Sequence, residues 1–347
     1  MLNDVFILPT PKNISSIWNF GFLLGIIIIF QIISGLLVAL FYNRNINFAF
    51  KAVMIIIIED VNYGGLIRIY HINGASFIFL LLYLHIGRGI YYRSFNKLTH
   101  VWISGVIIYL ICIAVAFLGY VLPWGQIRYW GATVITNLFS AIPYCGLIIV
   151  EFLWGRFGVS NNTLIRFYIL HFLLPFLIIG YIIIHLIYLH LSGSSNRLNN
   201  GLNKIKFSIF FSVKDSIYYL SLLRIIIIII FYSPYYLSDS ENFIEANSIV
   251  TPVHIKPEWY YLWAYAILRS VPNKLGGVLL LFGALGILFF LPVLNLNYRL
   301  TQNIFWRFIR NFLLLTWIGG NLVEFPYIQL GGIFTFRFYL FLIIIRI

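Results

Sequence analysis

Charged residues are scarce in this sequence. Only 10% of its 347 residues are Asp, Glu, Lys or Arg, whereas 61% are hydrophobic, and the mean hydropathy is +0.94. Soluble globular domains carry about 25% charged residues. This composition therefore excludes an ordinary soluble domain and indicates a polytopic membrane protein, with the lipid bilayer as its surroundings.

Cysteine is almost absent as well. It occurs at Cys112 and Cys145, which form no Cys-x-x-Cys motif. This excludes a disulfide framework, a zinc knuckle and covalent attachment of a c-type haem. The net charge of +13 could suggest nucleic acid as a partner. We predict no such binding, because the basic residues form no single patch and instead flank apolar runs, as loops between membrane spans do.

The apolar runs predict an all-α fold with eight transmembrane helices. We place them at about residues 19–42, 66–92, 101–122, 165–191, 217–237, 275–295, 308–322 and 328–346. Between spans three and four, residues 123–164 contain Pro123 and Pro143 and are interpreted as a helical hairpin on the membrane surface. Residues 52–58 are apolar but too short to cross, and residues 192–214 resemble an interfacial connector. A short amphipathic segment is expected at about 258–270.

The sorting of charge gives these spans a direction. An even number of spans puts both termini on one face, and eleven basic residues lie on that face before the last span, against Asp4 and Asp215. The other eight acidic residues lie on the opposite face. By the positive-inside rule, the N-terminal face is the cytoplasm or the mitochondrial matrix. No signal or transit peptide pattern precedes the first span, and the polyisoleucine runs are typical of an AT-rich, organellar genome. We therefore expect the mitochondrial inner membrane, with a bacterial plasma membrane as the alternative.

Two histidine pairs share one spacing inside these spans. His71 and His85 are fourteen residues apart, and so are His171 and His185. Fourteen helical residues rise ~21 Å and turn through almost four whole turns. The two spans run in the same direction, so we predict an outer site from His71 and His171 and an inner site from His85 and His185. A single histidine on an apolar helix is usually a hydrogen-bonded core residue, but four matched in spacing and depth indicate two non-covalent, b-type haems.

Glycines repeat the same interval on the other two spans of this bundle. Gly21 and Gly35 lie on span one, and Gly105 and Gly119 lie on span three. Because a porphyrin between four helices needs close approach from the helices that give no ligand, glycine is suited to these positions. We expect Gly21 and Gly105 at the inner haem and Gly35 and Gly119 at the outer one. The alternative is ordinary helix packing.

Polar residues lie at both ends of the predicted haem bundle. Arg68 and Arg88 are candidates for binding haem propionates, or they are snorkelling flank residues. On the inner face, His190, Ser194, Lys214 and Asp215 are candidates for a quinone site, since a histidine and a carboxylate can hydrogen-bond the two quinone oxygens. On the outer face, Glu258 is a candidate proton acceptor, or it is a solvated loop carboxylate.

The motifs that carry these residues resemble those of cytochrome b of the ubiquinol–cytochrome c reductases, respiratory complex III. The resemblance covers nearly the whole chain and rests on residues 18–21 (WNFG), 71–76 (HINGAS), 119–126 (GYVLPWGQ), 130–137 (WGATVITN), 190–194 (HLSGS), 254–260 (HIKPEWY), 264–269 (AYAILR) and 272–277 (PNKLGG). The similarity to the plastoquinol–plastocyanin reductases is weaker, because there the protein is split into two chains and the second histidine pair is one residue wider.

This resemblance implies bifurcated oxidation of ubiquinol. The quinol would bind at the outer face, where the implied site residues are Tyr120, Gly131, Pro257, Glu258, Trp259, Tyr260 and Tyr265. One electron would pass to a Rieske iron–sulfur protein, and the other would cross both haems to reduce quinone at the inner face, contributing to proton translocation. The implied partners are the Rieske protein, a c-type cytochrome subunit, other complex III subunits and a second copy of the complex. The implied domains are residues 1–200, the haem-binding four-helix bundle, and residues 201–347, with four spans and the Pro-Glu-Trp-Tyr loop.

Four residues depart from the family pattern. Arg197 replaces a usual proline, Arg128 a small or apolar residue near the quinol site, and Phe325 a frequent histidine. Arg337 lies in the body of the last span. Two other functions are compatible with parts of the sequence: a di-haem membrane anchor serving another enzyme, which would lack the Pro-Glu-Trp-Tyr loop, and a transporter without cofactor. A reduced-minus-oxidised spectrum distinguishes the haem proteins from the transporter.

Overall fold

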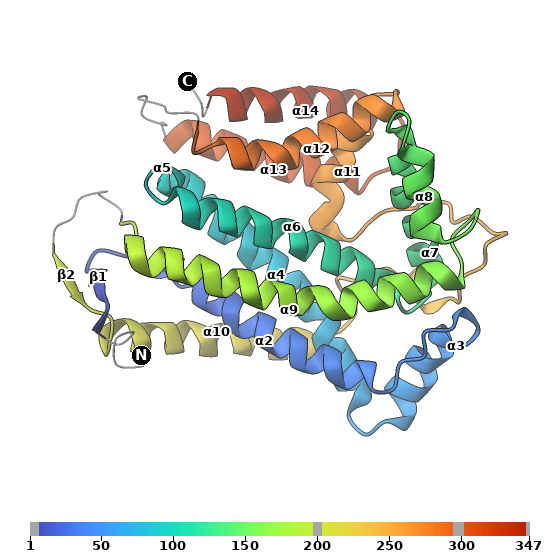
Figure 1. The fold of residues 1–347 in the computed structure, drawn as a ribbon, viewed down its shortest axis with the longest axis horizontal. Coiled ribbons are helices and arrows are strands. Elements are labelled where there is room, and N and C mark those ends of the chain that lie inside the picture. Colours follow the sequence, from blue (N-terminus) through green and yellow to red (C-terminus); the bar gives the residue numbers. More distant parts are fainter. Residues whose placement is uncertain (1–6, 197–202, 294–301, 345–347) are drawn as a thin grey trace. The chain divides into compact units, whose positions relative to one another are not determined.

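A computed structural model describes residues 7–196, 203–293 and 302–344 (Figure 1). Its architecture is helical, as the apolar runs predict. The eight helices that correspond to the predicted spans are α2 (Phe20–Ala39), α4 (Gly64–Tyr91), α6 (Thr99–Val121), α9 (Asn161–Ser192), α10 (Phe210–Tyr232), α12 (Lys274–Phe290), α13 (Gln302–Gly319) and α14 (Tyr327–Ile344). The last three are the shortest.

Five of these helices are long and apolar enough to cross a bilayer. They are α2 together with the preceding 3₁₀ turn η1 (Ser16–Trp18), α4, α6, α9 and α10. Helices α12 and α14 are apolar but shorter, and α13 is not among the candidates. Arg307 and Arg310 lie in its first half, and Asn311 follows directly after them. The number of eight spans is therefore not confirmed by length and composition in the described part of the chain.

Short helices fill the connections. Residues 52–58 belong to a π-helix, η2 (Ala52–Asp60), which continues α3 (Ile46–Lys51). The predicted surface hairpin consists of α7 (Gln126–Asn137), η3 (Leu138–Ala141) and α8 (Gly146–Trp154). The Trp154 indole donates a 2.6 Å hydrogen bond to Thr136 and so ties α8 to α7. The other short helices are α5 (Ser94–Lys97), η4 (Ser240–Phe243), η5 (Trp259–Tyr261) and α11 (Leu262–Leu268).

Two short strands were not predicted. Strand β1 (Pro9–Pro11) pairs antiparallel with β2 (Lys204–Lys206), with Thr10 opposite Ile205. The Lys12 amide extends the pairing by donating to the Asn203 carbonyl at 3.0 Å. Three residues give too little alternation of polar and apolar side chains to indicate a strand. The pairing ties the N-terminal segment to the connector before α10.

The chain forms two compact units, each assembled from separate segments. The first contains Met1–Ala39, Leu66–Cys112 and Phe176–Tyr236, and the second contains Leu40–Gly65, Ile113–Pro175 and Leu237–Ile347. Helices α6 and α9 contribute one part to each unit. These units are defined by contacts in space and differ from the two domains proposed along the sequence. The latter stay a prediction.

In the second unit, α11 packs closely on neighbouring helices. Gly277 of α12 and Gly319 of α13 approach the carbonyls of Leu268 and Leu262 so closely that a Cβ at either position would overlap the backbone. Trp263 of α11 lies buried between aromatic rings, with its centroid 5.4 Å from Phe312 and 5.7 Å from Phe338. This close packing fixes the loop that carries Glu258 immediately before α11.

Candidate haem and quinone sites

His85 of α4 and His185 of α9 face each other within the first unit. Their ring centroids are 6.5 Å apart, with an angle of 54° between the ring planes. Two imidazoles that bind one metal through their nearest nitrogens, each at about 2 Å, hold their centroids about 6 Å apart. The spacing of this pair therefore fits two axial ligands of one iron.

Glycine lies against the imidazole of each predicted ligand. An added Cβ would come 3.2 Å from His85 Cε1 at Gly21 and 3.1 Å from His185 Cε1 at Gly105. A Cβ added at Gly35 would come 2.9 Å from His71 Cε1, and one added at Gly119 would overlap the His171 ring. Each glycine thus accompanies the histidine expected at its depth. The close approach keeps the space beside each ring free of side-chain atoms, which is what a flat macrocycle requires.

Three of the four histidines have their Nδ1 atom engaged. Ser34 Oγ lies 2.9 Å from His71 Nδ1, and Ser104 Oγ lies 3.0 Å from His185 Nδ1. Each hydroxyl also donates to a backbone carbonyl of its own helix, that of Gln31 or of His100. The serine oxygens therefore accept from Nδ1–H and leave Nε2 free to bind a metal, the usual arrangement of a metal-bound histidine.

In His171 the proton is also held on Nδ1, but here a backbone carbonyl rather than a serine accepts it. Its Nδ1 lies 2.9 Å from the Val115 carbonyl oxygen, which can only accept, so Nδ1 carries the proton. His85 differs from the others, because its Nδ1 is buried without a hydrogen-bond partner among the described residues.

Sequence reasoning missed Ser34 and Ser104. The signal was present, since each serine directly precedes one of the predicted glycines, Gly35 and Gly105.

The two candidate propionate ligands lie on α4 in the first unit. Arg68 is buried, 4% exposed, although it is a cation. The Arg88 guanidinium lies over the Trp18 ring, 5.6 Å from its centroid. That stacking directs Arg88 toward the segment that precedes Gly21 and so places it on the side of the inner histidine pair. Both arginines are thus positioned inside the helical unit rather than on its surface.

The inner quinone candidates divide into two groups. Asp215 accepts a 2.5 Å hydrogen bond from Asn19, and Lys214 donates at 3.1 Å to the Ile14 carbonyl. Both contacts tie α10 to the segment before α2. His190 is exposed at the end of α9, and Ser194 follows it in the loop. Within the described residues, no hydrogen bond or ion pair joins His190 to Asp215. Asn19, which the sequence reasoning missed, is the partner of this carboxylate.

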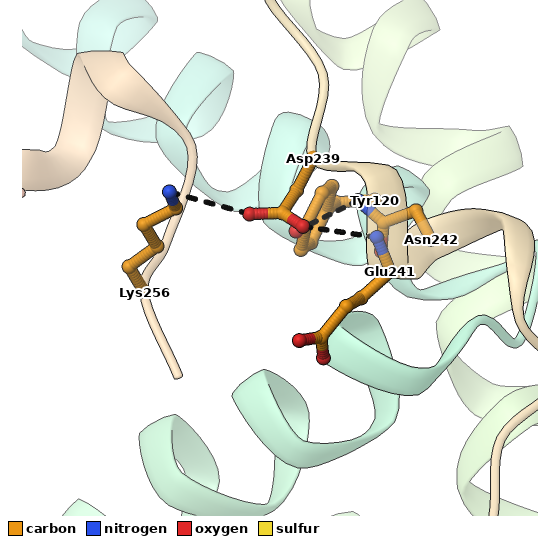
Figure 2. Close-up of polar contacts among 5 residues, drawn as sticks. All are labelled: Tyr120, Asp239, Glu241, Asn242 and Lys256. Carbon is orange, nitrogen blue, oxygen red and sulfur yellow. Dashed lines mark hydrogen bonds and ion pairs between the residues drawn. The ribbon is translucent and has the colours of Figure 1, made fainter. Parts of the chain in front are cut away.

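The outer candidates lie in the second unit, around the start of α7. Arg128 is buried, 4% exposed, with its guanidinium 4.8 Å from the centroid of the Tyr120 ring. Figure 2 shows the Tyr120 hydroxyl accepting a 3.4 Å hydrogen bond from Asn242. In the same view, Asp239 pairs with Lys256 at 3.4 Å and accepts from the Glu241 amide at 3.0 Å. Charged and phenolic groups are therefore gathered at one place.

Glu258 belongs to this cluster electrostatically. Burial raises the pKa of its carboxyl to about 7, and the negative charge of Asp239 acts in the same direction. Arg128 and Lys256 oppose this by favouring the carboxylate. A carboxyl group with a pKa near neutrality exchanges protons readily at physiological pH, which suits a general base. Its burial and raised pKa thus favour a role in proton transfer over the alternative of an ordinary solvated loop carboxylate.

Contacts of the Gln126 side chain and the Gly125 backbone hold the segments of the outer cluster together. Gln126 donates to the Val250 carbonyl at 2.5 Å and accepts from the Asn247 amide at 2.7 Å. Gly125 lies so close to Asn242 that a Cβ there would come within 2.7 Å of its carbonyl oxygen. The glycine of the Leu-Pro-Trp-Gly motif therefore has a structural reason, since it lets the chain before α7 pair with the loop that precedes Glu258.

The remaining outer candidates lie in the same unit. The Tyr265 hydroxyl donates to the Ile255 carbonyl at 3.3 Å, and Arg269 lies 5.0 Å over the Tyr265 ring. Pro257 directly precedes Glu258, and the rings of Trp259 and Tyr260 meet edge to face with centroids 5.7 Å apart. Gly131 of α7 has open space where its side chain would be.

The four departures from the family pattern have different settings. Arg128 belongs to the outer cluster. Phe325 is 80% exposed before α14, and Arg337 is exposed on that helix. Arg197 lies outside the described residues. Of the three that the structure describes, Arg128 is the one that lies beside residues that we expect to handle quinol.

Comparison with known proteins shows the family to which this chain belongs. Residues 5–193 match the family model described as cytochrome b/b6/petB, and residues 245–340 match cytochrome b(C-terminal)/b6/petD. A solved structure described as a hyperthermophilic respiratory complex III is similar over 98% of this chain and 93% of its own, with a TM-score of 0.92 and 29% sequence identity. Members of this family bind b-type haems and serve respiratory electron transfer. The chain is thus a multi-pass membrane protein that belongs to the cytochrome b family.

Proposed function

We propose that this chain is the cytochrome b subunit of a quinol–cytochrome c reductase. In this role it oxidises ubiquinol at the outer cluster and reduces quinone at the inner face, where His190, Ser194, Lys214 and Asp215 lie. Its expected partners are a Rieske iron–sulfur protein, a c-type cytochrome subunit, other subunits of the complex and a second copy of the complex. A mitochondrial inner membrane is the expected location, with a bacterial plasma membrane as the alternative.

The observation that supports this proposal most strongly is the inner histidine pair. His85 and His185 stand at a separation that suits one iron, and Gly21 and Gly105 keep the space beside their rings clear. His71 and His171 have matching surroundings, each in its own unit. Two b-type haems bound by these pairs would supply the one-electron redox chemistry that links the two quinone sites.

The outer cluster supplies groups for proton release. Quinol oxidation gives up two electrons and two protons, so the protein must accept protons as the quinol hydroxyls lose them. Glu258 can do so because the pKa of its carboxyl lies near 7. Tyr120 and Tyr265 line the same region and can orient the quinol by hydrogen bonding, and Arg128 stabilises the ionised form of Glu258.

A spectrum of the purified complex tests the haem assignment. The wild type is expected to show two b-type haems in a reduced-minus-oxidised spectrum. His185→Leu should remove the inner haem alone, because His71 and His171 are unchanged. Loss of the outer haem alone would overturn the depth assignment, and absence of any b-type α-band in the wild type would overturn the proposal.

Glu258→Gln tests the outer site separately. The amide cannot accept the proton, so we expect quinol oxidation to slow by about 10²–10⁴-fold, the usual contribution of a general base, while both haems remain. Steady-state turnover with quinol and an electron acceptor measures the effect. Unchanged turnover with intact haem spectra would remove Glu258 from the mechanism and leave the haem sites untouched.

A further inference from the structure

Arg128 is a buried cation to which the described part of the chain offers no bound anion. Its side chain is 4% exposed, and its Nε is buried without a hydrogen-bond partner among the described residues. The guanidinium lies over the Tyr120 ring, 4.8 Å from the centroid. It acts on Glu258 through its charge, but no ion pair joins these two residues in the structure. Since a buried charge without a counter-ion is costly, the position is suited to an anion that comes from outside the chain.

Two other arginines of the second unit also lie over aromatic rings, but each has an acceptor. Arg166 lies over the Phe152 ring and donates to the carbonyl of the same residue. Arg269 donates to the Ile318 carbonyl. Stacking on a ring therefore goes with a hydrogen bond to the chain in both of these arginines. Arg128 has the ring without the acceptor.

The place of Arg128 in its helix gives no structural reason for a cation. Arg128 is the third residue of α7, close to the N-terminal end of the helix. The helix dipole puts a partial positive charge at that end, so a positively charged side chain there is unfavourable and an anion is favoured. Burial and the dipole thus both act against the cation, which indicates a role in binding rather than in stabilising α7.

Open space lies on the same face of α7. Gly131 follows Arg128 by three residues, and residues at this interval lie on one face of a helix. Gly131 is buried, yet an added Cβ would meet no atom within 4 Å. Beside Tyr120, Asn242 is 1% exposed and its Oδ1 is buried without a partner among the described residues. The face of α7 that carries Arg128 therefore has room for a ligand, and an unused acceptor lies nearby.

We propose that Arg128 binds the quinol oxygen that becomes negatively charged at the outer site. This inference rests on the proposed function, because it takes quinol as the substrate there. When a quinol hydroxyl gives its proton to the Glu258 carboxylate, the carboxyl becomes neutral and the negative charge passes to the quinol oxygen. The net charge of the cluster does not change, and Arg128 offsets the negative charge in either state. Guanidinium donors bind an ionised oxygen more strongly than a neutral hydroxyl, so Arg128 selects for quinones and quinols with a readily ionised ring oxygen.

Binding of an acidic quinone analogue tests this role without turnover. The probes are a hydroxynaphthoquinone with an alkyl tail, whose ring hydroxyl is ionised at neutral pH, and its neutral methyl ether. Titration calorimetry gives the affinity of the purified complex for each. We expect Arg128→Leu to weaken binding of the acidic probe by about 10–100-fold, as the loss of a hydrogen bond to a charged group does. The methyl ether should bind as it does to the wild type. Arg128→Lys keeps the charge and should keep most of the affinity for the acidic probe.

Arg166→Leu is the matched control, because Arg166 also stacks on a ring in the second unit but has its own carbonyl acceptor. This variant should bind both probes as the wild type does. Equal loss of the two probes in Arg128→Leu would overturn the proposal, because the charge of the ligand would then have no part in binding. Displacement of the acidic probe by inorganic phosphate alone would also overturn it, by showing a site for small anions.

A double variant separates Arg128 from Glu258. Glu258→Gln with Arg128→Leu should lose as much affinity for the acidic probe, relative to Glu258→Gln alone, as Arg128→Leu loses relative to the wild type. If that loss disappears, Arg128 acts only through Glu258 and the proposal is wrong, while the proposed function stands. If the wild type binds neither probe, the quinol site itself is wrong. Haem spectra of each variant show that the complex has assembled.

Discussion

Arg128 puts a buried positive charge beside groups that we expect to handle quinol protons. It stacks on Tyr120 and is the largest influence that opposes the raised pKa of Glu258. The resemblance to the cytochromes b leads us to expect a small or apolar residue at this position, so the charge distinguishes this chain from that pattern. Its consequence is electrostatic, because a nearby cation favours the ionised form of a carboxyl.

Replacing Arg128 should therefore move the pH dependence of quinol oxidation. Burial raises the pKa of Glu258 to about 7, and without Arg128 the carboxylate loses stabilisation, so its pKa rises further. Since only the ionised carboxylate accepts a proton, the acid limb of the rate profile in Arg128→Leu should move upward by about 1 pH unit, the low end of the effect of a neighbouring arginine. Arg128→Lys keeps the charge and should leave the limb in place. An unmoved limb in Arg128→Leu would show that Glu258 does not sense this charge.

The serine partners of the histidines make a second prediction at this scale. Ser104→Ala removes the acceptor for His185 Nδ1–H, and Ser34→Ala removes the acceptor for His71 Nδ1–H. Loss of such a partner typically weakens metal binding by about 10–100-fold. We expect Ser104→Ala to lower the inner haem content alone and Ser34→Ala the outer haem content alone. Redox-titrated difference spectra measure both, and each variant is the control for the other. Equal effects on both haems would contradict the assignment.

At the scale of the helix, α2 carries its own internal control. A Cβ at Gly21 would come 3.2 Å from His85, whereas a Cβ at Gly25, one turn later, meets nothing within 4 Å. Gly21→Val should therefore push the imidazole away and remove the inner haem, while Gly25→Val should keep both haems. Haem content per chain is the measurement. If both variants retain two haems, the glycine interval reflects general helix packing rather than room for a macrocycle.

The helices also show what apolar runs can and cannot predict. The long spans were placed within a few residues, but α10 begins at Phe210, seven residues before the expected start. Its first turns contain Lys214 and Asp215, which interrupt the apolar run although the helix continues through them. In the same way, α13 begins at Gln302 rather than near residue 308. Hydropathy locates the part of a helix that faces lipid, whereas backbone hydrogen bonds decide where the helix begins.

The sites were partly predictable for similar reasons. The histidine and glycine intervals follow from helical geometry alone, so the sequence was enough to propose which glycine accompanies which histidine. The Ser-Gly pairs were visible but not interpreted. The Val115 carbonyl that binds His171 has no sequence signal, because every residue has a carbonyl. The contact between Asn19 and Asp215 joins residues 196 positions apart, and only the folded chain brings them together.

For the whole molecule, the number of spans decides which face carries the C-terminus. Helix α13 is the uncertain member, since it was not among the candidate spans. Its 18 residues rise ~27 Å, close to the ~30 Å of the hydrocarbon core. Arg307 and Arg310 lie in its first half, where long side chains reach the interface. We therefore expect α13 to cross the bilayer, which gives eight spans and puts both termini on the positively charged face.

Labelling from one side of the membrane tests this expectation. Cys145 is exposed in the hairpin between α7 and α8, and Cys112 is buried, so an impermeant maleimide added to the outer face should label the chain at Cys145 alone. Cys145→Ser is the control and should abolish labelling. A protease-sensitive tag at the C-terminus should be cut only from the face opposite to Cys145. If the tag is cut from the same face as Cys145, the number of spans is odd. In that case α13 lies along the membrane surface.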